Sequence, residues 1–252
     1  MLTSLLPGFR HLRTPFALGA LCAFQMWILI GEYIPSRSEA QGFTERIYSL
    51  GDVAGRGAVT AAISFLLYLV GDIVSISPNQ MMRILEKLRL PALAPHRFSV
   101  ISAQSRYELN EFASRAFSGR GNASSDDVSL LAQKMVMEFA EIRMRLIATH
   151  LDVYLEHDRY DSEADFRTNV GFYSTTLWPI VALYWTPWFI IGVFASAALF
   201  AIGLKARRDA NAILVQVIVS GIVESRYYVE ESSRDHSPSV GNVTIRRQTS
   251  TR

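Results

Sequence analysis

Charged residues are distributed unevenly along the chain, so that long uncharged, apolar segments alternate with polar ones. The longest apolar segment runs from Gly171 to Leu204 and contains no Asp, Glu, Lys, Arg or His over its thirty-four residues. A single helix of that length would measure about 50 Å, whereas the hydrocarbon core of a bilayer is about 30 Å thick. We therefore expect an interruption, and Pro187, which lies between two tryptophans, is the predicted break because proline donates no backbone hydrogen bond.

Two earlier apolar segments predict two further membrane spans, at about residues 15–33 and 57–76. The first continues with Phe24, Met26 and Trp27 beyond any signal-peptide cleavage site, so we expect it to remain as an anchor. Small residues predict a close contact between these two spans, and they are Gly19, Ala20 and Ala23 on the first span and Gly57, Ala58, Ala61, Ala62 and Ser64 on the second. Residues 35–55 are predicted to form a short exposed loop.

Positive charges at the ends of the spans predict the topology. Lysines and arginines in short loops tend to remain in the cytoplasm, and here they precede the first span, follow the second and follow residue 204. This distribution requires an even number of crossings. It predicts an all-α integral membrane protein of the cell membrane, with two transmembrane hairpins (1–76 and 171–204) flanking a helical cytoplasmic domain and both termini in the cytoplasm. The alternative is one tilted span at about 182–204, which would place Lys205 outside.

The cytoplasmic domain is predicted to occupy residues 77–170. An amphipathic pattern predicts a helix at 78–90, a second helix is expected at 102–117, and one long juxtamembrane helix is expected at about 126–170. The long helix carries a heptad-like apolar stripe that supplies four candidate contact residues, Met135, Phe139, Ile142 and Leu146. This stripe is suited either to packing against residues 81–90 of the same chain or to association with another chain.

Two carboxylates near the span ends, Glu32 and Asp72, are the candidate intramembrane polar residues. A charge within an apolar span is costly, so placement at the membrane interface is the favoured interpretation and a proton or cation pathway is the alternative. His150 and His157 would lie about 10 Å apart along a helix, too far to hold one zinc ion. We therefore expect no metal site, but a solvated acidic face with two ion pairs at four-residue spacing, Glu141 with Arg145 and Glu163 with Arg167.

The remaining segments and the composition limit the function further. Residues 205–231 predict a juxtamembrane helix, and residues 232–252, with few apolar side chains, predict a disordered tail. The chain has 25 Lys and Arg against 23 Asp and Glu, a balance that gives no basis for nucleic-acid binding. Its single cysteine, Cys22, excludes an intramolecular disulfide.

No phosphate-binding loop, nucleophile elbow or paired-cysteine zinc motif occurs in the sequence. We therefore expect a non-enzymatic protein without a cofactor. The predicted function is that of a membrane-anchored scaffold or sensor in the lipid bilayer. We expect this protein to associate with a second copy of the chain or with a helical protein partner. The alternatives are an ion channel, transporter or membrane-permeabilising effector, and a membrane-bound metal-dependent enzyme.

Overall fold

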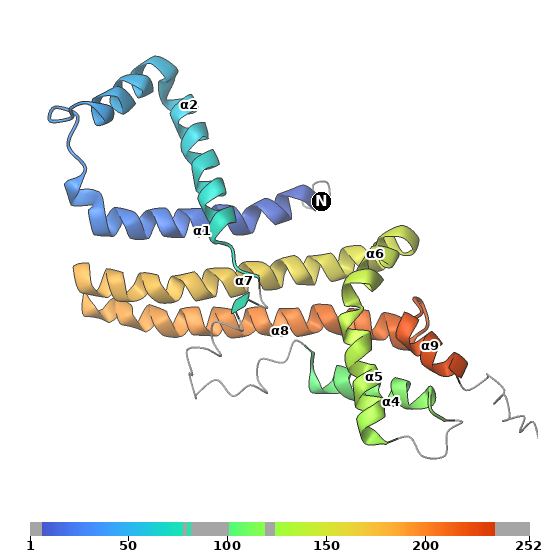
Figure 1. Cartoon of the computed structure of the whole chain (residues 1–252). Coiled ribbons are helices and arrows are strands. Elements are labelled where there is room, and N and C mark those ends of the chain that lie inside the picture. Colours follow the sequence, from blue (N-terminus) through green and yellow to red (C-terminus); the bar gives the residue numbers. More distant parts are fainter. Residues whose placement is uncertain (1–6, 78–79, 82–100, 119–123, 235–252) are drawn as a thin grey trace, which may run out of the picture. The chain divides into compact units, whose positions relative to one another are not determined.

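The computed structural model describes residues 7–77, 80–81, 101–118 and 124–234. Every regular element in these ranges is a helix, so the all-α prediction is confirmed for them (Figure 1). Three of the helical segments are long and apolar enough to cross a membrane, namely Leu12–Tyr33, Phe43–Val74 and Pro187–Val219. The chain divides into two compact units: unit 1 comprises residues 1–101 and 155–211, and unit 2 comprises residues 102–154 and 212–252.

Unit 1 begins with α1 (Pro7–Ile30), a short 3-10 helix η2 (Gly31–Tyr33) and α2 (Phe43–Val74). The second helix starts well before the predicted residue 57, so much of the expected 35–55 loop is helical. Gly55 lies inside α2 with a φ of 79°, a conformation that glycine adopts without steric cost, and it produces a kink there.

The two helices α1 and α2 cross at glycines. A Cβ atom on Gly19 would collide with the carbonyl oxygen of Leu67, and one on Gly71 would collide with that of Pro15. The backbones therefore touch, as at other small-residue interfaces of apolar helices. Around Gly57, in contrast, the space is open, so the close contact lies at the C-terminal end of α2.

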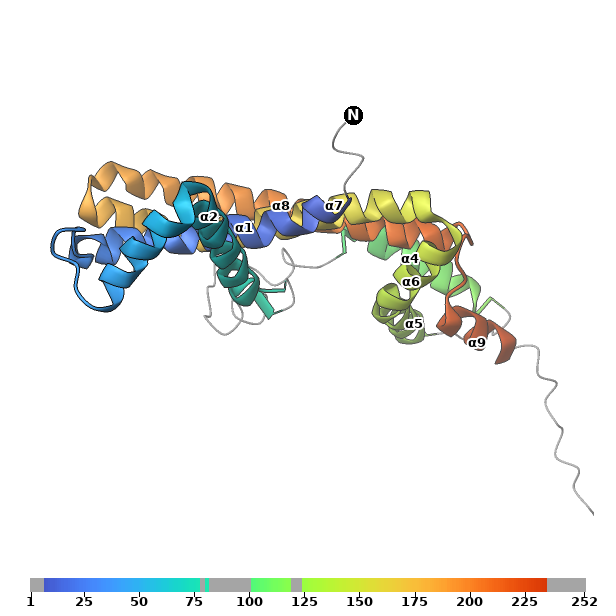
Figure 2. The same ribbon diagram turned by 90° about the horizontal axis from the view of Figure 1, so that it is seen from above.

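Within unit 1, α7 (Leu151–Tyr184) and α8 (Gly192–Val219) run antiparallel and side by side (Figures 1 and 2). Their backbones approach closely where Gly171 meets Phe200. Nearer the turn, the indole Nε1 of Trp178 donates a hydrogen bond of 2.8 Å to Ser196 Oγ. The chain reverses just after Tyr184, and the 3-10 helix η4 (Pro187–Ile191) leads into α8.

The helix α8 continues through Lys205 to Val219, so the separate helix expected to begin at residue 205 is wrong. The first charged residue, Lys205, does not end the helix, because the backbone hydrogen bonds of a helix can continue past a charged side chain.

The helix α1 lies beside α7 and runs parallel to it. Arg13 contacts Glu163, 150 positions later, and Gln25 donates to the carbonyl oxygen of Tyr173, 148 positions later. This nearly constant separation shows that the two helices run in the same direction. The end of α2 also reaches α7, since the backbone N–H of Ile76 donates to Asn169 Oδ1 at 3.1 Å.

Unit 2 contains α4 (Ala103–Arg115), α5 (Ser125–Met137), α6 (Phe139–Thr149) and α9 (Arg226–Arg234). Ser124 and Asp127 form a capping box that fixes the start of α5. The single long helix expected over 126–170 is wrong, because the chain bends at Glu138 and leaves helical geometry at His150 (φ −141°, ψ 69°). Neither bend needs proline or glycine, since burial of the apolar side chains of both α5 and α6 in one core outweighs the continuity of a helix.

Two predictions fall mainly outside the described residues. Of the amphipathic helix expected at 78–90, only Gln80 and Met81 are described, and both are helical. Of the tail expected at 232–252, only the first three residues are described, and they form the end of α9.

Candidate functional site

Charged side chains join α1, α7 and α8 within unit 1, and we refer to them as the charged belt: Arg13, Asp161, Glu163, Asp165, Arg167 and Arg207. At its centre, Glu163 accepts hydrogen bonds of 2.7 Å from Arg13 and from Arg167. Burial raises the pKa of Glu163, but the hydrogen bonds and charges of the two arginines outweigh burial and hold that pKa below its usual value. The ion pair of Glu163 with Arg167, predicted from its four-residue spacing, is confirmed. Arg13 also lies over the ring of Phe166, 4.1 Å from its centroid.

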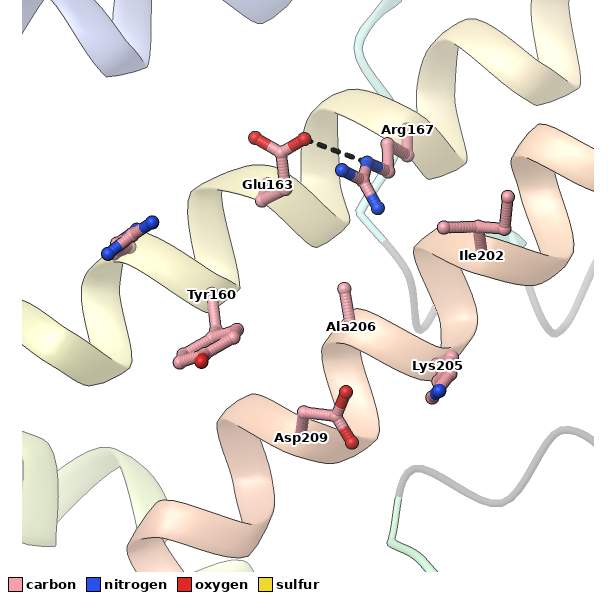
Figure 3. A pocket seen from close by; sticks show the side chains of 8 residues that line it. Tyr160, Glu163, Arg167, Ile202, Lys205, Ala206 and Asp209 are labelled. Atoms are coloured by element: carbon pink, nitrogen blue, oxygen red, sulfur yellow. Dashed lines mark hydrogen bonds and ion pairs between the residues drawn. The ribbon is translucent and has the colours of Figure 1, made fainter.

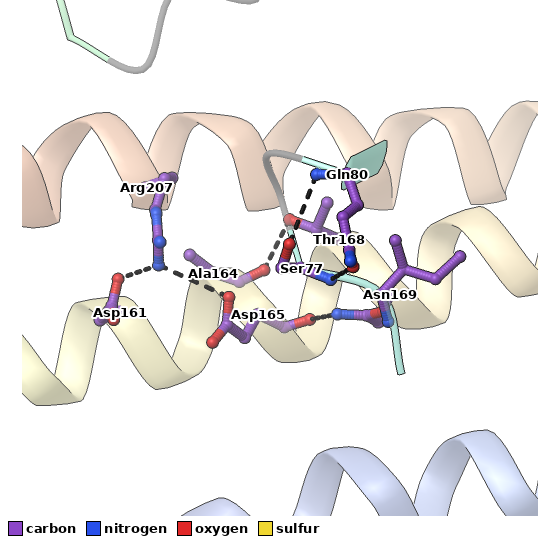
Figure 4. Close-up of polar contacts among 9 residues, drawn as sticks. Ser77, Gln80, Asp161, Ala164, Asp165, Thr168, Asn169 and Arg207 are labelled. Carbon is purple, nitrogen blue, oxygen red and sulfur yellow. Dashed lines mark hydrogen bonds and ion pairs between the residues drawn. The ribbon is translucent and has the colours of Figure 1, made fainter. Parts of the chain in front are cut away.

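Arg207 of α8 forms the second part of the belt. Its guanidinium reaches across to α7, where it pairs with Asp161 and lies 3.5 Å from Asp165 Oδ1 (Figure 4). The side chains of Arg207 and Asp161 are only 21% and 18% exposed. Because water screens a pair as shielded as this only weakly, loss of one partner costs more than it does at an ordinary surface pair.

A pocket of about 480 Å³ lies in unit 1 between α7 and α8, next to the belt (Figure 3). Its polar lining consists of Arg159, Tyr160, Glu163 and Arg167 from α7 and Lys205 and Asp209 from α8. Ile202 contributes an apolar side chain to the lining. The lining combines three cations with two carboxylates, and one of these carboxylates, Glu163, is already paired with arginines.

The two histidines lie in different surroundings. His157 is buried and its Nδ1 lies 3.0 Å from the carbonyl oxygen of Ala210, which can only accept, so this nitrogen carries the hydrogen. His150 lies at the bend that follows α6. No group of three or more metal-ligating side chains occurs among the described residues.

The structure places the candidate membrane residues at or near helix ends. Glu32 lies in η2, directly after α1, and Asp72 lies in the last turn of α2, and both are exposed. Pro187 is the first residue of η4, between α7 and α8. Cys22 is half-buried in α1 with a free thiol.

The four candidate contact residues are all buried inside unit 2. Met135, Ile142 and Leu146 are fully buried and Phe139 is 8% exposed, in a core that also contains Leu109 of α4 and Leu214 of α8. The apolar stripe therefore forms the interior of the unit, and the expectation that these four side chains contact another chain is not supported.

A different set of apolar side chains on α5 and α6 is exposed. The surface of these helices carries Met137 (79% exposed), Met144 (68% exposed), Leu130 and Ile147, and the exposed Leu151 follows as the first residue of α7. We refer to these five residues as the methionine surface. Lys134, three residues before Met137 on α5, and Glu141, four residues after it on α6, are both exposed.

Glu138 forms a buried polar site at the bend between α5 and α6. Its carboxylate accepts hydrogen bonds from Ser225 Oγ at 2.7 Å and from the backbone N–H of Arg226 at 2.8 Å, and Arg145 lies 3.6 Å away. Arg145 also forms the predicted ion pair with Glu141, which is confirmed at 2.7 Å. These contacts attach the start of α9 to the bend.

Sequence reasoning missed Glu138, the Asp161–Arg207 pair and the pocket. One signal for Glu138 was available, because a carboxylate stands between the two apolar stripe positions Met135 and Phe139. In the sequence, Arg207 and Lys205 indicate only the topology. The partners of Arg207 on α7 lie more than forty positions away, and nothing local in the sequence identifies them.

Comparison with known proteins gives no assignment: no protein-family model, no curated protein and no solved structure matches this chain.

Proposed function

We propose that this chain is a non-enzymatic, multi-pass membrane protein that holds a helical unit at the cytoplasmic face and acts by association of that unit with a second copy of the chain. The observation that carries the association is the methionine surface, whose large apolar side chains are exposed although the unit buries a core of its own. Exposed apolar clusters on a folded unit mark sites of association, and methionine side chains adapt readily to a facing helix.

The direction of the helices supports the membrane part of the proposal. Two hairpins with both termini on one side require α1 and α7 to run parallel, and α8 to run antiparallel to both. The hydrogen bonds between these helices within unit 1 support the same directions. Gly71 near the end of α2 touches Pro15 near the beginning of α1. The second helix therefore ends beside the point where the first begins, as a hairpin requires.

The uncharged stretches of these helices have similar lengths. They begin or end at Arg13 in α1, Asp72 in α2, Arg167 in α7 and Lys205 in α8. When η4 is counted with α8, they contain between fifteen and eighteen residues. At 1.5 Å per residue this corresponds to about 22 to 27 Å, close to the thickness of a thin bilayer core. All four boundary residues belong to unit 1.

A second copy is the proposed occupant of the methionine surface because of the charges beside it. Lys134 and Glu141 lie on either side of Met137, so a twofold arrangement can place the lysine of one copy opposite the glutamate of the other. Confinement to a membrane also keeps copies of one chain at high effective concentration.

Labelling of single cysteines tests the topology. In a Cys22→Ser background, Ser38→Cys, Thr186→Cys and Ser233→Cys are each treated with a membrane-impermeant maleimide in intact cells. We expect Ser38→Cys and Thr186→Cys to react, and Ser233→Cys to react only after lysis. Protection of Thr186→Cys in intact cells would contradict the second hairpin, and reaction of Ser233→Cys there would contradict a cytoplasmic unit 2.

A charge-matched pair of variants tests the association. The double variant Met137→Glu with Met144→Glu adds two negative charges to the methionine surface. The control, Ala103→Glu with Ser114→Glu, adds the same charges to exposed positions of α4 in the same unit. Mass photometry in detergent should show dimers for the wild type and the control and monomers for the methionine variant. A monomeric wild type, or a dimeric methionine variant, would contradict association through this surface.

A further inference from the structure

The pocket between α7 and α8 carries cations that the fold does not use. Arg13 and Arg167 neutralise Glu163, and Arg207 pairs with Asp161, but neither Arg159 nor Lys205 pairs with a carboxylate among the described residues. Both cations are exposed at the pocket, so both are available to an anionic ligand.

The other polar groups of the pocket are compatible with an anion. Glu163 holds its negative charge against two arginines, and the lowered pKa of its carboxyl reflects this compensation. Asp209 lies on α8 one turn beyond Lys205, and Tyr160 contributes a hydroxyl that can donate a hydrogen bond (Figure 3). Asp209 also has no ion pair among the described residues, so the uncommitted groups are two cations, one carboxylate and the hydroxyl of Tyr160, and the excess positive charge favours an anion.

An apolar surface begins at the same pocket. Ala195, Ala198, Ile202 and Lys205 are all exposed and follow one another on α8 at intervals of three and four residues, so they lie on one face of the helix. Ile202 belongs both to this face and to the lining of the pocket. A ligand with an anionic head and an apolar chain fits this arrangement, with the head at Lys205 and the chain along α8 toward Ala195.

We propose that this pocket binds the phosphate headgroup of an anionic phospholipid, with one acyl chain along the exposed face of α8. The inference rests on the proposed membrane location, in which Lys205 lies at the boundary of the uncharged stretch of α8. Basic side chains at that level attract anionic lipids, and basic pockets between membrane helices bind their headgroups.

Binding of short-chain lipids to the detergent-purified full chain tests the proposal. The probes are dioctanoyl phosphatidylglycerol, dioctanoyl phosphatidylcholine and inorganic phosphate, measured by microscale thermophoresis. We expect phosphatidylglycerol to bind at least tenfold more tightly than either of the other two. Equal affinity for phosphatidylcholine would contradict recognition of an anionic headgroup. Equal affinity for inorganic phosphate would contradict binding of the acyl chain and would identify a simple phosphate site.

Variants locate the binding at this pocket. Arg159→Gln and Lys205→Gln should each weaken phosphatidylglycerol binding about fivefold, because one basic residue near an anionic lipid contributes about 1 kcal/mol. Arg46→Gln in α2 removes the same charge from an exposed position and should leave the affinity unchanged. An effect of Arg46→Gln equal to that of Lys205→Gln would overturn the site.

Failure of the lipid site can be distinguished from failure of the proposed function. Carbonate extraction of cell membranes shows whether the chain is embedded in the membrane, and it does not depend on the pocket. A chain released by carbonate would contradict the proposed function, whereas an embedded chain with no preference for the anionic lipid would contradict only the lipid site.

Discussion

Ser225 donates a hydrogen bond of 2.7 Å to the buried carboxylate of Glu138, eighty-seven positions earlier in the sequence. The backbone N–H of Arg226 donates to the other carboxylate oxygen. One side chain at the α5–α6 bend therefore satisfies two donors at the start of α9. Because Glu138 is only 4% exposed, water cannot replace it.

Glu138→Ala should destabilise unit 2 and release α9. Each buried donor left without a partner costs about 1 to 3 kcal/mol, so we expect a loss of about 2 to 4 kcal/mol in the free energy of unfolding. Hydrogen exchange should show reduced protection of the amides of α9. Glu141→Ala is the matched control, because it removes an exposed partner of the same Arg145 and should cost less than about 0.5 kcal/mol. Equal losses in the two variants would contradict the role of Glu138.

Asp161 and Arg207 should show a larger coupling energy than an exposed ion pair of the same type. A double-mutant cycle with Asp161→Asn and Arg207→Gln should give about 1 to 3 kcal/mol, because both side chains are largely shielded from water. Arg37 and Asp52 form the control pair, with side chains 66% and 55% exposed, and their coupling should stay below about 1 kcal/mol. Thermal unfolding in one detergent measures both cycles, and similar coupling energies would show that burial does not strengthen the belt.

The features that sequence reasoning predicted depend on local patterns. Helical periodicity and apolar length predicted the helical class and three segments suited to a membrane, although the arm expected in α7 is not one of them, and four-residue spacing predicted the pairs Glu141–Arg145 and Glu163–Arg167. Each of these depends on residues within a few turns of one another, so the sequence contains the whole signal.

The features that it missed depend on residues far apart in the chain. The apolar stripe with Met135 and Ile142 has the same spacing whether it faces a second chain or its own core, and only the fold shows that it is buried. The bend at Glu138 likewise depends on Ser225, which no local pattern connects to it. The pocket combines residues 159–167 with residues 202–209, which come together only because the chain reverses near Pro187.

Two glycine substitutions should change stability in opposite directions. Gly19→Ala places a methyl group against the backbone of Leu67, and overpacking of this kind costs about 1 to 3 kcal/mol. Gly57→Ala meets open space within α2 and should stabilise the helix by up to about 1 kcal/mol, because alanine favours the helical conformation. The melting temperatures in detergent should therefore fall for Gly19→Ala and rise slightly for Gly57→Ala. A fall of the same size in both would contradict the close crossing of α1 and α2.

Glu163 should make the stability of unit 1 depend on pH in the acid range. Its pKa in the folded protein lies below the ordinary value of 4.5, so the folded state favours the charged carboxylate. The stabilisation is therefore complete at pH values above 4.5 and is lost as the pH falls through the lowered pKa of the folded state. The measurement is the difference in melting temperature between the wild type and Glu163→Gln as a function of pH. This difference should stay constant in the neutral range and shrink below pH 4.5.

Removal of one arginine provides the control for this pH dependence. In Arg13→Gln, Glu163 keeps only Arg167, so its pKa should move back toward 4.5 and the stabilisation should be lost at a higher pH than in the wild type. A difference that grew as the pH fell would mean that protonation of Glu163 favours the folded state. That result would contradict the two-arginine arrangement at the centre of the belt, because a carboxyl held by Arg13 and Arg167 can only lose stabilisation when it is protonated.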